Sequence, residues 1–454
     1  MGQAIQLDAV VDGQKIRWFN INLLLWSFLA MFADGYDISV MPFAAKDFTH
    51  LWHLGPGSLT PVLTASSYGV LLGAPLLGWV GDRFGRKTAI LLASFIYGVS
   101  TLAVVLTSGL WETAALRFIT GIGIGGLMPN TIALNSELAP KRWRATLVVL
   151  MFTGITLGSG APGQVAAWVM PHYGWKALFV LGGSVPLLVA ACLVFTLPES
   201  IKYLALRPER RPAALRLARR LRPDLSIADD ASLVVARETP SPGSGLAQVL
   251  GREFRWITPL LWLCFGMTLM ANYFLNTWMP LLYVDAGLSE RDAALASSLY
   301  HVGGAVGGVL VSVLLDRFGY LVAAGLYVVA VPAIAAIGGA ATSYAVLAPL
   351  SLVAGLAVLG TQFGNNATAG LLYPTTFRSK GVGWALSIGR LGAIIGPTIG
   401  GLLIKRHWPM RDLFLAVSVP MLVGAIGALV LVRLCWVRLG ELRISDVPGG
   451  RSGA

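Results

Sequence analysis

Five ionisable side chains interrupt the long apolar stretches of this sequence, where charge is otherwise rare. They are Asp34, Asp37, Arg117, His301 and Arg390. The carboxylates and the imidazole can take up and release a proton, whereas a guanidinium can hold a carboxylate through two parallel hydrogen bonds. If the apolar stretches cross a membrane, each such charge costs at least ~2.5–3.5 kcal/mol at the bilayer centre, so function is the usual reason for its presence. The set predicts an organic-anion site that is coupled to protons.

The depths of these groups can be estimated from the helical rise of about 1.5 Å per residue. Asp34 lies eight residues before Pro42, about 12 Å below the outer end of its apolar stretch. Arg117 lies five residues after Glu112, about 8 Å down from the same surface. We expect Asp34 and Arg117 to approach one another, so that protonation of Asp34 frees Arg117 for an anion. A purely structural ion pair is the alternative.

Further polar and aromatic side chains in the same stretches are candidates for contact with a ring-bearing substrate. Aromatic residues that could sandwich a ring are Tyr36, Tyr273, Trp278, Phe363 and Trp384. Amides that could hydrogen-bond ring hydroxyls are Asn272, Asn276, Gln362 and Asn365. The alternative for each is packing against lipid or a neighbouring helix. His301 could likewise satisfy itself against a backbone carbonyl, and Asp37 could belong to an interfacial turn.

The elements that must position these groups follow from composition. The 454 residues have a mean hydropathy of +0.71 and only 12% charged residues, whereas soluble domains carry about 25%. About 20 apolar residues cross a bilayer, and twelve stretches of that kind are present. Their approximate bounds are 18–42, 58–80, 88–109, 112–136, 145–170, 176–197, 256–283, 293–315, 321–340, 343–372, 381–404 and 412–437. The sequence predicts an all-α membrane protein of twelve transmembrane helices.

The distribution of Lys and Arg orients the predicted helices. With both termini in the cytoplasm, 26 of the 34 basic residues fall on the cytoplasmic side, six fall outside and two lie within the spans. This bias sets topology in membrane proteins. The formal charge of +12 is therefore a membrane-orientation signal, and we expect no nucleic-acid partner.

An internal repeat divides the chain into two halves. Asp82-Arg83-Phe84-Gly85 recurs as Asp316-Arg317-Phe318-Gly319 at an offset of 234 residues, and Pro140 recurs as Pro374 at the same offset. We expect an N-terminal six-helix bundle over residues 1–197, a cytoplasmic linker over 198–255, and a C-terminal six-helix bundle over 256–454 with a short tail. Repeats of this kind hold substrate between the halves near the midplane.

Gly81-Asp82-Arg83-Phe84-Gly85-Arg86-Lys87 resembles the signature loop of the major facilitator superfamily. Asp34-Gly35-Tyr36-Asp37, followed by Pro42, resembles a narrower group, the aromatic acid/proton symporter family. Further agreement with that family comes from Arg117-Phe118-Ile119-Thr120-Gly121, Pro129-Asn130, Glu137, Pro198-Glu199-Ser200 and Gly389-Arg390-Leu391-Gly392.

The resemblance covers nearly the whole chain and implies the major facilitator fold, with a cytoplasmic gate that breaks as the two halves rock. The residues it implies for that gate are Asp82, Arg83, Arg86, Glu137 and Arg378. It further implies import of a benzoate- or hydroxybenzoate-like carboxylate with protons, across a bacterial inner membrane, by a chain that functions as a monomer in the lipid bilayer.

Several other functions are compatible with parts of the sequence. Pro198-Glu199-Ser200 also occurs in sugar carriers, although two arginines at depth argue against a neutral sugar, and another organic acid is a further possibility. The glycines and proline between Gly154 and Gly163 partly imitate the pattern of antiporters, so a drug or cation exporter is a third reading. Since the chain carries no nucleophile–base motif, metal-ligand cluster or appended soluble domain, we expect no enzyme, cofactor or metal. Cys192, Cys264 and Cys435 all lie in apolar runs, which predicts no disulfide framework.

Overall fold

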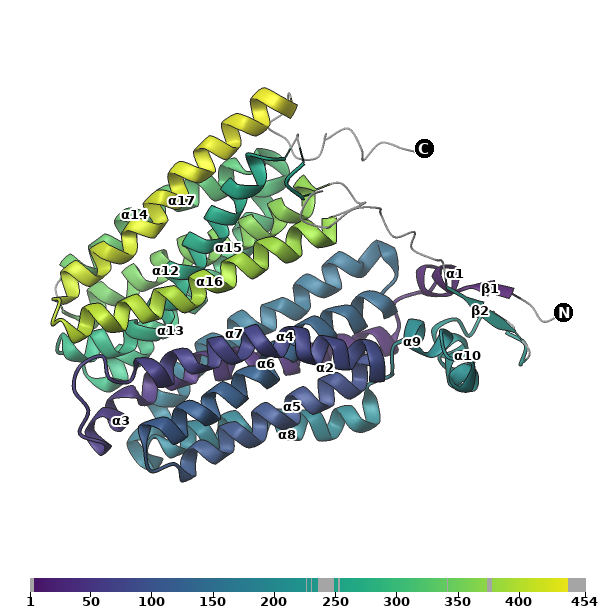
Figure 1. Cartoon of the computed structure of the whole chain (residues 1–454), viewed down its shortest axis with the longest axis horizontal. Helices are drawn as coiled ribbons and strands as arrows, with labels where there is room; N and C mark the ends of the chain where they lie inside the picture. The colour runs from purple at the N-terminus through teal and green to yellow at the C-terminus, as the bar shows by residue number, and fades with distance from the viewer. Residues whose placement is uncertain are drawn as a thin grey trace. The chain divides into compact units, whose positions relative to one another are not determined.

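The computed structural model describes residues 4–225, 227–229, 231–235, 249–251, 254–340, 342–373 and 378–439. Twelve helices of between 18 and 33 residues dominate this part of the chain (Figure 1). They are α2 (Trp18–Val40), α4 (Thr60–Phe84), α5 (Arg86–Ala103), α6 (Leu110–Leu138), α7 (Lys141–Tyr173), α8 (Lys176–Thr196), α12 (Ile257–Asp285), α13 (Glu290–Phe318), α14 (Leu321–Gly339), α15 (Tyr344–Leu372), α16 (Arg378–Lys405) and α17 (Met410–Leu439). Each of the twelve predicted spans corresponds to one of them, and the predicted fold class is confirmed.

Ten of these helices are long and apolar enough to cross a membrane by length and composition. The other two, α6 and α7, are more polar. Helix α6 buries Arg117, Asn130 and Asn135 inside the protein, and α7 begins with Lys141 and Arg142. Polar residues on a membrane helix must face protein or water rather than lipid, which indicates that α6 is an interior helix of its bundle.

Contacts divide the chain into two compact units. Unit 1 comprises Met1–Ile38, Ala65–Ser159 and Phe179–Thr239, and unit 2 comprises Ser39–Thr64, Gly160–Leu178 and Pro240–Ala454. Unit 2 thus contains α12 to α17 together with the turn η1 (Met41–Ala44) and the short helix α3 (Ala45–Leu51), which follow α2.

The described part of the predicted linker after α8 contains regular secondary structure. It forms α9 (Ile201–Ala205), the turn η3 (Pro208–Arg210), α10 (Arg211–Leu221) and β2 (Ser232–Val234). Strand β2 pairs in parallel with β1 (Ala4–Gln6), which precedes α1 (Leu7–Asp12). These elements gather at one end of the unit 1 helices (Figure 1).

The Asp-Gly-Tyr-Asp motif of α2 lies where α2 packs closely against α7. A Cβ added at Gly35 would lie 2.1 Å from the carbonyl oxygen of Ile155 on α7, and one added at Gly158 would lie 2.0 Å from that of Phe32. Backbones approach this closely only where one side chain is absent. The glycine between Asp34 and Tyr36 therefore seats α2 against α7 and fixes the direction of both aspartates.

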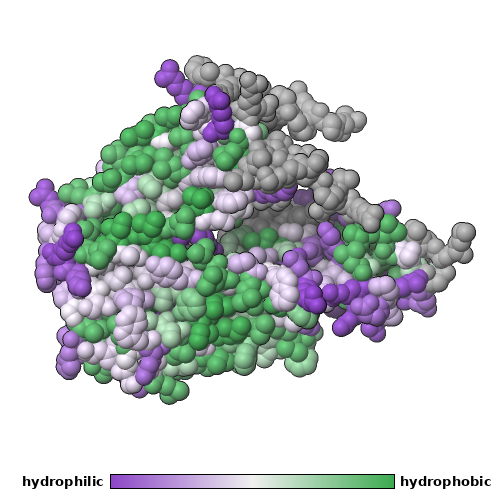
Figure 2. Space-filling model, viewed as in Figure 1, coloured by the Kyte–Doolittle hydropathy of each residue, from purple (hydrophilic) through white to green (hydrophobic). Residues whose placement is uncertain are grey.

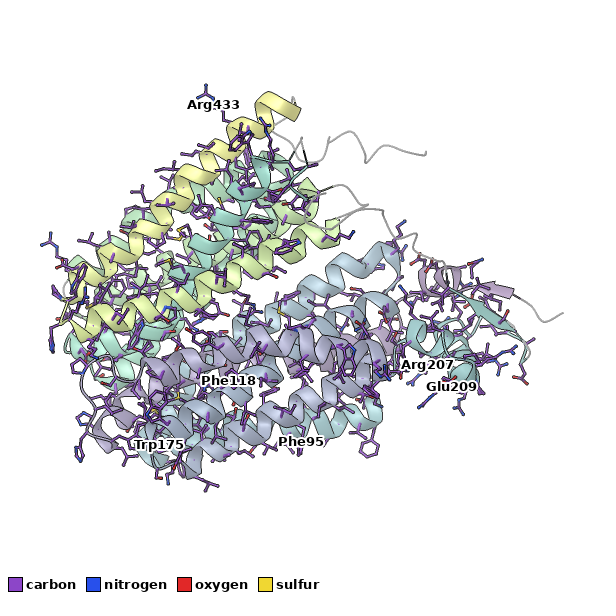
Figure 3. The ribbon with its side chains drawn as sticks, viewed as in Figure 1. Phe95, Phe118, Trp175, Arg207, Glu209 and Arg433 are labelled. Carbon is purple, nitrogen blue, oxygen red and sulfur yellow. The ribbon has the colours of Figure 1, made fainter. Side chains whose placement is uncertain are left out.

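The outer surfaces of both units suit a bilayer. Hydrophobic residues follow the sides of the long helices, whereas hydrophilic residues gather over α9 and α10 (Figure 2). Phe95 projects from α5, while Arg207 and Glu209 lie beyond the ends of the long helices, beside α9 and α10 (Figure 3). This distribution matches a lipid-facing band with polar ends.

Candidate functional site

Arg117 on α6 forms a buried ion pair with Asp37 on α2. Its Nη1 donates to Oδ2 of Asp37 at 2.8 Å, and the two side chains are 3% and 0% exposed. Its Nη2 donates to the backbone oxygen of Asp37 at 3.1 Å, and the hydroxyl of Thr101 on α5 donates to Oδ1 at 2.6 Å. Three helices thus converge on one carboxylate, which is fully hydrogen-bonded as a buried charge requires.

The guanidinium keeps one unused donor. Among the residues that the structure describes, no acceptor lies within hydrogen-bond distance of the buried Nε of Arg117. A buried donor left without a partner costs about 1–3 kcal/mol, so such a group is a natural place for a ligand or a water molecule to bind. Arg117 can therefore hold Asp37 with two nitrogens and offer a third to an anion.

The partner of Arg117 differs from the one that the sequence predicts. The ion pair joins Arg117 to Asp37, one helical turn beyond Asp34. The physical reason is depth: Asp37 lies five residues before Pro42, about 7.5 Å from the outer end, which matches Arg117 better than the 12 Å of Asp34. Asp34 is itself buried, at 2% exposed, as is Tyr36 of the same motif.

Unit 2 brings together two of the predicted substrate ligands, Asn272 and Gln362, and the predicted proton-coupling residue His301 lies nearby. The hydroxyl of Tyr300 donates to Oδ1 of Asn272 at 2.8 Å, and Nδ2 of Asn272 donates to Gln362 at 3.2 Å. His301 follows Tyr300 on α13; it is buried, and its Nδ1 has no hydrogen-bond partner in the part of the chain described. Amide and imidazole groups of this kind can orient a polar ring substituent.

Two other predicted ligands, Trp278 and Asn365, are buried and hydrogen-bonded to other residues of unit 2. Trp278 is completely buried in the hydrophobic core of unit 2, and its indole N–H donates to the backbone oxygen of Pro397 at 3.0 Å. Asn365 is buried, accepts from the hydroxyl of Tyr320, and donates to the hydroxyls of Thr268 and Tyr327. The polar atoms of both side chains are thus hydrogen-bonded within unit 2, which favours a structural role over contact with substrate.

The remaining predicted ligands of unit 2 are more accessible. Asn276 on α12 and Arg390 on α16 are partly buried, and Trp384 on α16 is exposed with its ring 5.9 Å from that of Trp262. Their exposure keeps them available to a ligand.

Three of the predicted gate residues, Asp82, Arg86 and Glu137, form a connected network in unit 1. Arg86 pairs with Asp82 at 2.6 Å, and its Nε lies 3.8 Å from the carboxylate of Glu137 at the end of α6. The hydroxyl of Ser200 donates to Glu137. The guanidinium of Arg83 lies 5.8 Å from the ring of Trp79, a cation–π contact. The side chain of Arg378, the remaining predicted gate residue, lies outside the described part of the chain.

A second carboxylate, Glu199, joins this loop to the end of α8. It accepts from the backbone N–H of Lys87 at 3.1 Å and from that of Ser200 at 2.8 Å. Burial raises the pKa of Glu199, and these N–H groups partly offset the rise. Gly85 has a φ of +105°, so the backbone conformation favours glycine, and a Cβ there would lie 2.1 Å from Oε2 of Glu199, whose side chain would have to shift.

A further charged cluster, which the sequence reasoning missed, lies in unit 2. Lys46 on α3 pairs with Glu290 at the start of α13 at 2.8 Å, although 244 residues separate them. The guanidinium of Arg291 lies 4.4 Å from the ring of Trp168 on α7. Opposite charges in two predicted outer loops were the available signal, but composition alone does not say which loops meet. Lys46, Glu290 and Arg291 help line a cavity of about 190 Å³.

No group of three or more metal-ligating side chains occurs in the described part of the chain.

Comparison with known proteins agrees with this architecture. Residues 23–370 match the family model of the Major Facilitator Superfamily. The chain is 34% identical over 426 residues to the 4-hydroxybenzoate transporter PcaK of Pseudomonas aeruginosa, covering 92% of this chain and 94% of the relative. It is 34% identical over 420 residues to a gallate transporter of Pseudomonas putida, covering 92% and 93%.

Solved structures show the same fold. The crystal structure of a bacterial homologue of the human lysosomal transporter Spinster, in an inward-facing and occupied conformation, matches with a TM-score of 0.70 at 17% identity, covering 93% of this chain and 99% of that chain. The chain is thus a multi-pass membrane transporter rather than an enzyme. It belongs to the major facilitator superfamily and, within it, to the aromatic acid/proton symporter family.

Proposed function

We propose that this chain imports an aromatic carboxylate, benzoate- or hydroxybenzoate-like, together with protons across a bacterial inner membrane. The observation that carries the proposal is Arg117, a buried guanidinium that has one carboxylate partner and whose Nε–H has no acceptor among the residues that the structure describes. A guanidinium is the side chain best suited to planar recognition of a carboxylate. The relatives that transport 4-hydroxybenzoate and gallate support the aromatic class.

We propose that different residues bind the carboxylate and the aromatic ring of the substrate. Arg117 binds the substrate carboxylate, with Arg390 as a second cation that compensates its charge. Asn272 and Gln362 hydrogen-bond a ring hydroxyl, because the amide of Asn272 already donates to that of Gln362 and this hydrogen bond can be redirected to a ligand. Tyr36, Asn276 and Trp384 remain candidate contacts of the ring.

The proposed coupling rests on competition for one cation. The substrate carboxylate and the aspartates of α2 are all anions, and only a limited number of them can be stabilised by Arg117 at once. Protonation of Asp34 or Asp37 lets the substrate bind, and release of the proton on the other side favours substrate release. His301 is a further candidate for carrying a proton. Alternating access by the two six-helix halves completes the cycle.

Uptake into proteoliposomes tests the proposal. One proton with a monoanion carries no net charge, so a pH gradient alone would drive accumulation of labelled 4-hydroxybenzoate, whereas a second proton would add ~2.3 kcal/mol per 100 mV of membrane potential. A panel with gallate, an aliphatic acid, a sugar and an organic cation separates the alternative carriers. Accumulation that persists after complete uncoupling would refute proton coupling, and transport of the sugar or cation in place of aromatic acids would refute the substrate class.

We further propose that both termini face the cytoplasm and that one chain forms the complete pathway. Labelling of single cysteines placed in the loop before α13 and in the loop after α4, in intact cells and in inverted vesicles, tests the orientation.

A further inference from the structure

A cavity of about 450 Å³ opens on unit 1 between the start of α5 and the α9–α10 segment. Its volume falls in the ~300–1,000 Å³ range typical of small-molecule sites. Four basic side chains line it, those of Lys87, Arg210, Arg216 and Arg220, against one carboxylate, that of Glu199. The cavity is therefore strongly positive, and none of the transport roles proposed above uses it.

The geometry of α10 produces this concentration of charge. Arg216 and Arg220 lie one turn apart on α10, and Arg210 immediately precedes the helix, while Leu217 and Leu221 are buried within unit 1. An amphipathic helix of this kind is anchored through its apolar face and leaves the arginines on the open side.

Carboxylates are outnumbered by arginines around this cavity in the part of the chain that the structure describes. The carboxylate of Glu199 is already bound by two backbone N–H groups, and Arg220 lies over the ring of Phe19 at 5.3 Å. Within the described ranges, Arg210 and Arg216 form no ion pair with a carboxylate. Like charges held together on one helix repel one another, so this face is set up for an external anion.

The cavity adjoins the lipid-facing surface. Phe84, half exposed at the end of α4, is part of its lining. Nζ of Lys87 donates to the backbone oxygen of Val194 at 2.6 Å, and the next residue, Phe195, is 88% exposed. Aromatic residues at the level of the headgroups together with arginines just beyond them are the surroundings of a phospholipid rather than of a solute in bulk water.

We propose that this cavity binds the phosphate of an anionic phospholipid, with Arg210 and Arg216 as its principal ligands and the acyl chains against the apolar side of Phe84 and Phe195. Guanidinium groups bind phosphate oxygens in pairs. On the proposed orientation the cavity belongs to the cytoplasmic leaflet, where basic clusters beside membrane helices recognise anionic headgroups.

Native mass spectrometry of the purified full chain tests the proposal independently of transport and orientation. The amount of phosphatidylglycerol that stays bound is compared with the amount of phosphatidylcholine that stays bound. Both measurements are repeated with inorganic phosphate as a competitor. The wild-type chain should retain phosphatidylglycerol selectively. Arg210→Gln/Arg216→Gln should weaken that binding about 30-fold, or roughly fivefold for each arginine removed.

A matched control removes two exposed arginines elsewhere, Arg406→Gln/Arg411→Gln, and should leave the binding unchanged. If phosphatidylglycerol binding weakens equally in the two double variants, or weakens in neither, the proposed lipid site is wrong. Displacement of the lipid by millimolar inorganic phosphate would show a free-anion site instead and overturn the lipid assignment. If the double variant fails to fold by thermal melting, Arg216→Gln alone must show the fivefold loss.

Discussion

The pairing of Asp37 with Arg117 can be tested by neutralising the carboxylate while keeping its shape. Asp37→Asn retains an oxygen that can accept from the hydroxyl of Thr101, now 2.6 Å from Oδ1. It removes the negative charge that lies 2.8 Å from Nη1 of Arg117. The guanidinium is then a buried cation whose remaining contact with this residue is the backbone oxygen at 3.1 Å.

The expected cost follows from the burial of the pair. Removing one partner of a buried ion pair destabilises a protein by ~3–5 kcal/mol, because the other charge stays uncompensated. Because the amide of Asn can still accept a hydrogen bond, we expect the loss of unfolding free energy to lie at the lower end of this range, at about 3 kcal/mol. Arg117→Gln should cost a similar amount, and the double variant should be less destabilised than the two losses together, since neither charge then remains.

The assay is unfolding of the purified chain in mixed micelles, arranged as a double-mutant cycle and repeated with 4-hydroxybenzoate. If Arg117 also binds substrate, the anion replaces the missing carboxylate of Asp37→Asn. The substrate should then bind this variant at least ~10-fold more tightly than the wild type, which adds about 1.4 kcal/mol of stabilisation at saturating ligand.

Two results would refute the reasoning in different places. A loss below about 1 kcal/mol in Asp37→Asn would show that this ion pair contributes no more to stability than an exposed one does. If Asp37→Asn loses about 3 kcal/mol of unfolding free energy but gains no extra stabilisation from substrate, the ion pair has only a structural role. Arg117 would then not belong to the proposed binding site. Phe95→Leu, on the lipid-facing side of α5, provides a variant that should change neither quantity.

Four further predictions follow from other contacts. Arg117→Lys keeps the charge but loses the planar fork, so apparent substrate affinity should fall by roughly tenfold or more; unchanged affinity in binding titrations would count against the carboxylate role. Asp34→Asn should abolish uphill accumulation and preserve exchange of labelled for unlabelled substrate, whereas retained uphill transport would move the coupling role elsewhere. Gly85→Ala should destabilise the chain by at least ~1 kcal/mol because of its positive φ and the closeness of Glu199; a melting temperature equal to wild type would be inconsistent with this loop. Glu290→Gln should increase labelling of a cysteine placed at the N-terminal end of α13, and equal labelling rates would show that its salt bridge with Lys46 does not restrict access.

Most of the fold was predictable because the bilayer imposes a simple constraint. A segment must be apolar for about 20 residues to cross it, so runs such as 321–340 and 176–197 were recognisable without any knowledge of contacts. Segments outside the bilayer lack that constraint. Strand β1 has three residues and α10 has eleven, and both depend on partners more than 200 residues away in the chain or on burial that only the folded unit provides.

The site was predictable in its residue types and less so in its pairings. Charged residues in apolar runs identified Asp37 and Arg117, but the choice between Asp34 and Asp37 required both the depth and the facing of α2, which Gly35 sets through α7. Trp278 shows that the sequence also does not reveal which way an aromatic side chain faces. Nothing in its neighbourhood along the sequence distinguishes a ring that faces substrate from one that donates to the backbone of another helix.

The parallel pairing of β1 with β2 has a consequence for how the protein is made. Ala4 pairs with Ser232, so the strand that is synthesised first waits for a partner that leaves the ribosome only after the six helices of the first half. Synthesis proceeds at about 5–20 residues per second, and closing so long a loop is entropically unfavourable until the helices have brought its ends together. Formation of this two-stranded sheet therefore reports that the first half has been inserted and assembled. Protection of residues 4–6 from proteolysis in stalled nascent chains would appear only once residue 234 has emerged, and would mark the moment at which the first bundle becomes a finished unit.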